Sequence, residues 1–138
     1  MKVKDLYHVG IPVDDIDRAR EFYVNVLGLE FMDRVGGNPN NPDALEIHGK
    51  YQRLDRLRCG ASDVVLFERP RPLKRDALDQ DGIAHQAFDM DMRDYEEALR
   101  KAKELGRFHR IVERKSGKTI YMFDTEGNYL ELHFPTPR

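Results

Sequence analysis

The chain repeats one pattern along its length, and this repeat strongly limits what it can fold into. His8 and His85 are 77 residues apart, and each lies in a short, mostly apolar stretch that predicts a β-strand. Asp14 and Asp91 are also 77 residues apart, and each precedes apolar residues at helical spacing, as helix-capping residues do. A constant offset over two kinds of element indicates a duplicated module.

Each module is predicted to contain a strand, a helix and three further strands. Gly28 and Gly106, which are 78 residues apart, follow the two helical patterns as C-caps. The first module covers about residues 4–70, the second about 82–135, and a mixed-charge stretch with a proline, 71–82, links them. Strands are expected at residues 6–13, 29–35, 44–48, 51–59, 63–68, 83–88, 120–123 and 129–134, and the repeat places a further strand of the second module at 107–111. The predicted fold class is α+β, built from two tandem βαβββ modules.

The end of the chain predicts a hairpin that places a carboxylate in mid-strand. Residues 120–123 and 129–134 flank a glycine-containing turn, and the second strand alternates with period two. Its apolar face carries Leu130, Leu132 and Phe134, and its other face carries Tyr129, Glu131 and His133. An ionised Glu131 is costly to bury without a positive partner, and a bound metal cation is one such partner. A solvated outer face is the alternative.

Length and charge exclude several classes of protein. The 138 residues suit one compact domain, 1–138, with a single core. The formal net charge of −2 gives no basic excess for nucleic acid, so no nucleic-acid partner is expected. One cysteine excludes an intrachain disulfide and favours a reducing, cytoplasmic location. No stretch is long and apolar enough to predict a membrane span.

The repeat pairs residues that no local motif would pair. His8 and His85 take the same place in the two first strands, and Glu131 lies in the last strand of the second module. Two histidines and one carboxylate can hold a divalent metal on one side and leave other coordination positions open. We therefore predict His8, His85 and Glu131 as metal ligands, with a hydrogen-bonded core histidine as the alternative for His8.

The first module offers no matching acidic ligand at the position of Glu131. Aligning the modules through Pro70 and Pro135 puts Leu66 there, and leucine cannot bind a metal. Glu68 lies two residues further along and would point the same way as Leu66. It stays open as a fourth ligand if the register differs.

The sequence resembles the vicinal oxygen chelate superfamily, which includes glyoxalases, bleomycin-binding proteins, extradiol ring-cleaving dioxygenases and fosfomycin thiol transferases. The resemblance covers nearly the whole chain and rests on His8 within 7–13, the helix 19–28, His85, and the stretch 124–131. It implies paired βαβββ modules that curl into a cup-shaped mixed sheet with helices outside. It also implies one metal ion, a substrate that chelates it through two adjacent oxygens, and a homodimer whose second chain can complete the cup.

Within that superfamily, the three retained ligands favour two kinds of enzyme. They match ring-cleaving dioxygenases and fosfomycin transferases better than glyoxalases, which usually have two acidic ligands, and bleomycin-binding relatives generally lack the ligands. Tyr121, ten residues before Glu131, has the spacing of the tyrosine that contacts substrate oxygens in ring-cleaving dioxygenases, although packing also explains it. His109 is expected as an acid–base residue, or else at the surface. The resemblance thus favours a ferrous (Fe²⁺) dioxygenase. A lyase, isomerase or thiol transferase using Mn²⁺, Ni²⁺, Zn²⁺ or Mg²⁺ is the alternative, as is a drug-binding protein without turnover.

The remaining histidines and a basic cluster complete the candidates. His133 faces the same way as Glu131 and is a substitute ligand or a supporting residue, whereas His48 follows a weak strand and has no predicted role. The basic cluster comprises Arg53, Arg56, Arg58, Arg69, Arg71, Lys74 and Arg75. It predicts a solvated face or, if its members line the cup, an anionic small-molecule substrate.

Overall fold

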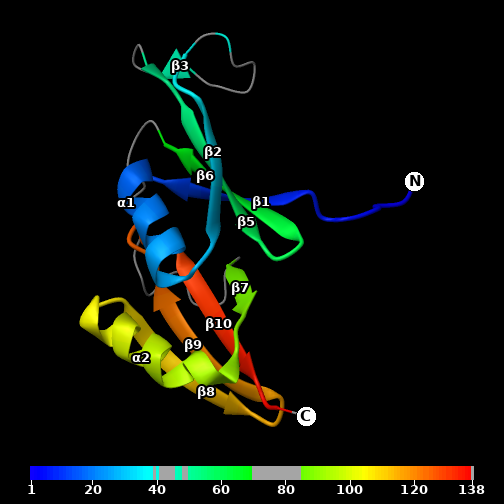
Figure 1. Ribbon diagram of the computed structural model, residues 1–138, viewed down its shortest axis with the longest axis vertical. Helices are drawn as coiled ribbons and strands as arrows, with labels where there is room; N and C mark the ends of the chain where they lie inside the picture. Colours follow the sequence, from blue (N-terminus) through cyan, green and yellow to red (C-terminus); the bar gives the residue numbers. More distant parts are fainter. Residues whose placement is uncertain (39, 41–45, 48–49, 70–84, 138) are drawn as a thin grey trace. The chain divides into compact units, whose positions relative to one another are not determined.

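The computed structural model describes residues 1–38, 40, 46–47, 50–69 and 85–137, and the chain divides into two compact units, Met1–Leu73 and Lys74–Arg138 (Figure 1). The first unit contains β1 (His8–Val13), α1 (Ile16–Glu21), η1 (Phe22–Val26), β2 (Glu30–Gly36), β3 (Glu46–Ile47), β4 (Lys50–Tyr51), β5 (Arg53–Cys59) and β6 (Ser62–Glu68). The second contains β7 (Gln86–Asp89), η3 (Met92–Asp94), α2 (Tyr95–Glu104), β8 (Phe108–Arg114), β9 (Gly117–Phe123) and β10 (Tyr129–Pro135).

The predicted α+β fold of tandem modules is confirmed. The prediction that both units form a single domain stays a prediction, and the predicted linker lies outside the described residues.

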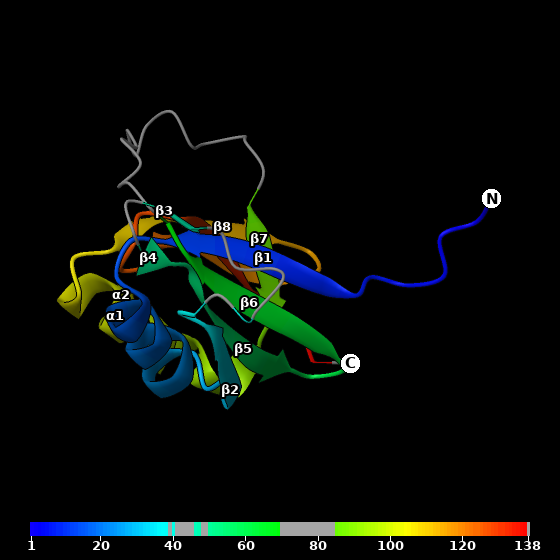
Figure 2. The same cartoon turned by 90° about the horizontal axis from the view of Figure 1, so that it is seen from above.

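The first unit is built on a four-stranded mixed sheet in the order β1-β6-β5-β2 (Figure 2). β1 pairs in parallel with β6, while the other neighbours are antiparallel. Side chains alternate between the two faces, and one face packs against α1. That face supplies the buried core of the unit, with Ile11, Val13, Ile16, Ala19, Phe22, Tyr23, Leu57, Val64 and Leu66 all nearly inaccessible to solvent. The short hairpin β3–β4 is an addition to the repeated module.

The first helix is capped by Asp15, one residue after the Asp14 that the repeat selected, and the helical segment ends before Gly28 as predicted. The Asp15 side chain accepts a hydrogen bond from the backbone N–H of Arg18 at 3.0 Å, which satisfies one donor of the first turn. The helix widens into a π-helix from Phe22, whose carbonyl accepts from the N–H of Leu27. Gly28 follows with a φ of 78°, a conformation that glycine adopts without strain.

The second unit repeats this plan with its own four-stranded mixed sheet in the order β7-β10-β9-β8. β7 is parallel to β10, and β10–β9 and β9–β8 are antiparallel. One face of the sheet forms the core, and α2 contacts β8 (Figure 1). Residues that are at most 2% exposed on that face are Ile120, Met122, Leu130, Leu132 and Phe134. The other face of the sheet is therefore available for polar side chains.

The second helix is capped as the repeat predicts. The Asp91 carboxylate accepts from the backbone N–H of Arg93 at 2.9 Å, a short 3₁₀ turn precedes α2, and Gly106 ends the helix with a φ of 65°. In the part of the chain that the structure describes, no helix has the length and apolarity needed to cross a membrane.

Candidate functional site

One face of the second unit's sheet gathers most of the residues that the sequence selected. In the β9–β10 hairpin, Glu131 lies directly opposite Tyr121, and Tyr129 lies opposite Phe123. Leu130, Leu132 and Phe134 point into the core, as predicted, so Glu131 and Tyr129 share the opposite face. The predicted faces of the last strand are confirmed.

His85 and Glu131 meet on this face. The Nε2 atom of His85 lies 3.0 Å from Oε2 of Glu131, and their side chains are 29% and 19% exposed. The parallel pairing of Ala87 with Glu131 brings them together, because His85 lies two residues before Ala87. The sequence placed His85 inside a strand at 83–88; residues 83 and 84 lie outside the described part of the chain, and β7 begins at Gln86. The structure therefore puts this histidine directly before the strand.

The donor set of this pair suits a divalent metal. Two ligand atoms bound about 2.1 Å from one metal ion, at right angles, lie ~3.0 Å apart. The observed 3.0 Å between His85 Nε2 and Glu131 Oε2 matches two neighbouring coordination positions as well as a hydrogen bond. Among the residues that the structure describes, no three His, Cys, Asp or Glu side chains gather in a group that could hold a metal ion. His8, the predicted third ligand, belongs to β1 of the other unit.

Two tyrosines and a histidine extend the cluster away from the His85–Glu131 pair. The rings of Tyr121 and Tyr129 stack with centroids 5.6 Å apart and an interplanar angle of 14°. The Tyr129 hydroxyl lies 2.7 Å from Nδ1 of His109, on β8. Thus Tyr121 contacts His85 and lies opposite Glu131, whereas His109 is linked to His85 through Tyr129. The sequence showed that Tyr129 faces the same way as Glu131 but assigned it no role.

Two arginines of β8 surround Tyr121. Arg114 donates to the Tyr121 hydroxyl at 3.3 Å and to Thr119 Oγ1 at 3.1 Å. The Arg110 guanidinium lies over the Tyr121 ring, 4.9 Å from its centroid. The pKa of Arg114 is raised, chiefly by the hydrogen bond to Tyr121 and also by the charge of Glu131. Positive charge therefore lies beside the tyrosine and the carboxylate.

The basic cluster selected from the sequence has a different role in its described part. Arg53 pairs with Glu68, Arg56 with Asp33, and Arg58 with Asp63. These ion pairs hold the arginines within the first unit, whereas Arg71, Lys74 and Arg75 lie outside the described residues. Within the second unit, the arginines that contact a candidate residue are Arg110 and Arg114 of β8, which the sequence patterns had not singled out. Alternation along residues 108–114, which places Arg110 and Arg114 on one face, was the signal that could have found them.

The first unit corrects the alignment of the two modules. Gly10 pairs with Val65 as Ala87 pairs with Glu131, so Val65 is the counterpart of Glu131. Leu66, which the prolines had aligned there, pairs with Ile11 and is fully buried in the core. The error arises because the two modules differ in length after the strand. Valine cannot bind a metal either, so the first unit still contributes no acidic ligand at this position.

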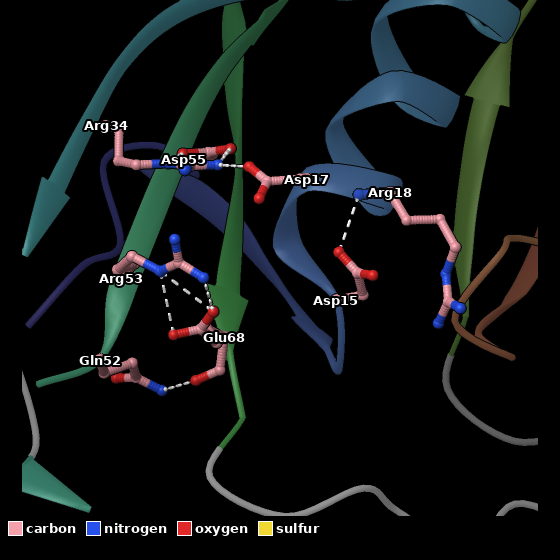
Figure 3. Close-up of polar contacts among 8 residues, drawn as sticks. All are labelled: Asp15, Asp17, Arg18, Arg34, Gln52, Arg53, Asp55 and Glu68. Carbon is pink, nitrogen blue, oxygen red and sulfur yellow. Dashed lines mark hydrogen bonds and ion pairs between the residues drawn. The ribbon is translucent and has the colours of Figure 1, made fainter. Parts of the chain in front are cut away.

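Glu68, left open as a fourth ligand, is engaged on the helix side of the first sheet. Its carboxylate receives the Arg53 guanidinium, with Nε at 3.1 and 3.2 Å from its two oxygens (Figure 3). It alternates in phase with the buried Leu66, so it lies on the face opposite to the face that carries His8. Glu68 is therefore a structural ion-pair partner in this unit.

Of the two remaining histidines, His133 lies in the described part of the chain and contacts Thr119. His133 Nδ1 lies 3.4 Å from Thr119 Oγ1, next to the residues that Arg114 contacts. This position on the Glu131 face suits the supporting role predicted for it. His48 lies outside the described residues.

Comparison with known proteins agrees with this architecture. Residues 5–132 match the family described as the Glyoxalase/Bleomycin resistance protein/Dioxygenase superfamily. No curated protein sequence matches the chain closely enough to count as a relative.

Solved structures of similar fold include several fosfomycin resistance proteins. The FosX protein of Listeria monocytogenes is 19% identical with a TM-score of 0.72, and the match covers 98% of this chain and 96% of that one. A mutant of the same FosX, complexed with Mn(II) and 1S,2S-dihydroxypropylphosphonic acid, is 19% identical with a TM-score of 0.70 over 98% and 95% of the chains. A glyoxylase/bleomycin resistance protein/dioxygenase domain from Frankia sp. EAN1pec is also 19% identical, with a TM-score of 0.69 over 98% and 94% of the chains. At this identity the likeness concerns the fold.

The repeated βαβββ units, the shared strand order and the family match over residues 5–132 lead to one conclusion. The chain belongs to the glyoxalase/bleomycin resistance protein/dioxygenase superfamily, that is, to the vicinal oxygen chelate superfamily.

Proposed function

We propose that the protein is a metal-dependent enzyme whose small-molecule substrate chelates the metal through two adjacent oxygens. The observation that carries this proposal is the contact of His85 with Glu131 on the same face as Tyr121 and the Tyr129–His109 pair. His8, His85 and Glu131 would hold one divalent ion. Bound there, the ion would act as a Lewis acid toward substrate oxygens.

The side chains around this pair are suited to orient a substrate. Arg114 donates to the Tyr121 oxygen, so the hydroxyl hydrogen of Tyr121 can be directed at another acceptor, such as a substrate oxygen. His109 is suited to act as a general acid or base, and its Nδ1 atom is already oriented by Tyr129. The core residues behind the sheet keep this face rigid.

In finer terms, we propose a ferrous ring-cleaving dioxygenase acting on a catechol-like substrate. The support is that Tyr121 and His109, which the resemblance assigns to that chemistry, lie on the same sheet as the His85–Glu131 pair. We also propose a cytoplasmic homodimer.

A second candidate is a lyase, isomerase, hydrolase or thiol transferase that acts on a small anion such as a phosphonate. The observation that favours it is that Arg110 lies over the Tyr121 ring and Arg114 donates to the Tyr121 hydroxyl, because guanidinium groups can bind a phosphonate or carboxylate. A FosX structure of similar fold holds Mn(II) and a dihydroxypropylphosphonic acid. Mn²⁺, Ni²⁺, Zn²⁺ or Mg²⁺ would then replace Fe²⁺.

Metal content and turnover together test the proposal. Protein purified without oxygen is analysed by elemental mass spectrometry as wild type, Glu131→Ala and Glu113→Ala. Glu113 is the matched control, because it lies on β8 of the same sheet with its side chain 71% exposed. We expect about one ion per chain in the wild type and the control, and a loss of the ion in Glu131→Ala.

The substrates then separate the candidates. Oxygen consumption with catechols and iron supports the dioxygenase, whereas opening of an epoxide phosphonate with manganese supports the second candidate. Absence of metal in the wild type, together with ligand binding that Glu131→Ala does not change, would establish a binding protein without catalysis and overturn the proposal.

A further inference from the structure

We infer that Tyr129 is a positioning residue that holds the imidazole of His85 in the orientation needed to bind a metal, and that His109 fixes Tyr129 in turn. This inference rests on the proposed metal site and adds to it two residues that act through His85 rather than on the substrate. It concerns only side chains of the second unit.

The position of His85 explains why it needs lateral support. His85 directly precedes β7, so it lies at the end of the strand and not within it. Its side chain is 29% exposed, and a surface imidazole ahead of a strand can rotate about two side-chain bonds. Ordering such a side chain when a ligand binds costs conformational entropy. A metal site gains affinity when packing has already removed that freedom.

The two stacked tyrosines provide that packing. The ring of His85 makes edge-to-face contacts with Tyr129 at 5.9 Å and with Tyr121 at 6.4 Å. The tyrosine rings stack nearly parallel to each other, and this stacked pair forms an aromatic wall beside the imidazole. Against this wall the His85 ring presents Nε2 to Glu131. Rotation of the ring would lose both aromatic contacts.

Tyr129 is itself fixed from several sides. It is 3% exposed, and its ring contacts Phe123 with centroids 5.1 Å apart. Its hydroxyl lies 2.7 Å from Nδ1 of His109, and the two rings meet edge to face at 5.4 Å. Because His109 comes from β8, two strands away from β10, this bond ties the wall to the far side of the sheet. The acid–base role proposed for His109 belongs to its other ring nitrogen, Nε2.

The test measures metal affinity alone and needs no substrate. Co²⁺ is added to metal-free protein, and its absorption spectrum gives both the Kd and the ligand environment. Tyr129→Leu removes the ring of the wall that lies nearer to His85, and we expect it to weaken Co²⁺ binding about 10- to 100-fold, the range found when groups that orient metal ligands are removed. Tyr129→Phe keeps the ring but loses the bond to His109, and we expect a loss of about threefold.

Tyr95→Leu is the matched control. Tyr95 is also a buried tyrosine of the second unit, in edge-to-face contact with Phe134 on the core side of the sheet. Its loss should lower the melting temperature but leave the Co²⁺ Kd unchanged, so it separates general destabilisation from positioning.

The outcomes also separate this inference from the proposed function. If wild-type protein binds no Co²⁺, the proposed metal site itself fails. If wild type binds Co²⁺ and Glu131→Ala does not, but Tyr129→Leu binds with unchanged Kd and spectrum, only the positioning role is overturned. Should Tyr129→Leu fail to fold, wild-type affinity in Tyr129→Phe would overturn the part assigned to His109 and its bond.

Discussion

Removing Arg34 should destabilise the first unit more than removing its buried partner. Arg34 donates through Nε at 2.6 Å and a terminal nitrogen at 2.9 Å to the two oxygens of Asp55, which is fully buried (Figure 3). The same guanidinium reaches Asp17 at 2.7 Å and so ties α1 to β2 and β5. In Arg34→Met, the buried Asp55 carboxylate would lose the guanidinium that pairs with both of its oxygens.

The expected losses of unfolding free energy differ because Asp55 is fully buried whereas Arg34 is partly exposed. Leaving one member of a buried ion pair without its partner costs about 3–5 kcal/mol. Because the Arg34 side chain is 26% exposed, water can enter after its removal, and we expect the lower end, about 3 kcal/mol. Asp55→Asn should cost about 1.5 kcal/mol, since the amide can still accept a hydrogen bond and Arg34 keeps Asp17 and solvent. The double variant Arg34→Met/Asp55→Leu should be more stable than Arg34→Met alone.

Urea unfolding followed by circular dichroism at neutral pH measures these differences. A cost below about 1 kcal/mol for Arg34→Met, or a larger cost for Asp55→Asn than for Arg34→Met, would refute the reasoning.

A second observable reports on Asp17. The hydrogen bond from Arg34 lowers the pKa of Asp17 below its usual value. This contact therefore stabilises the folded protein fully at pH values above the usual pKa of aspartate. The stabilisation is lost as the pH falls through the lowered pKa. In Arg34→Met, an NMR titration should show the pKa of Asp17 rising toward its ordinary value.

Further predictions concern backbone geometry, the thiol and the assembly of the site. Gly117→Ala should destabilise the protein by about 3 kcal/mol in urea unfolding, because its φ is 147° and a Cβ would lie 2.1 Å from a backbone oxygen of β10. Gly28→Ala, with no atom within 4 Å, should cost only about 1 kcal/mol. Burial raises the pKa of Cys59, so iodoacetamide should modify it at a higher pH than in urea-unfolded protein; equal pH profiles would contradict this. If a homodimer shares its sites, mixing His8→Ala with Glu131→Ala chains after mild denaturation should restore metal binding that each variant lacks, whereas sites within one chain would give no recovery.

Much of the fold could be predicted because its signals are local. The alternation of Leu130, Glu131 and Leu132 fixes which side chain faces the core, since successive residues of a strand point to opposite faces. Gly28 and Gly106 mark helix ends, because each takes a positive φ that other residues avoid. The repeat added the equivalence of His8 and His85, which no local pattern contains.

The register between paired strands could not be predicted from the sequence. Aligning the modules by their prolines selected Leu66, whereas the parallel pairing of β1 with β6 makes Val65 the counterpart of Glu131. One residue of shift moves every side chain to the other face, and register depends on loop lengths and pairing across the sheet. Sequence patterns do not record either quantity.

What the sequence by itself determined is therefore the order of the elements, the faces of the strands and the residue types available for a metal. Only the tertiary structure decided which of them meet: His85 with Glu131, Tyr129 with His109, and Arg53 with Glu68. The physical reason is that periodicity and capping act over a few residues, whereas these contacts join residues 15 to 46 positions apart. Such contacts exist only once the backbone hydrogen bonds of the sheets have set the strands side by side.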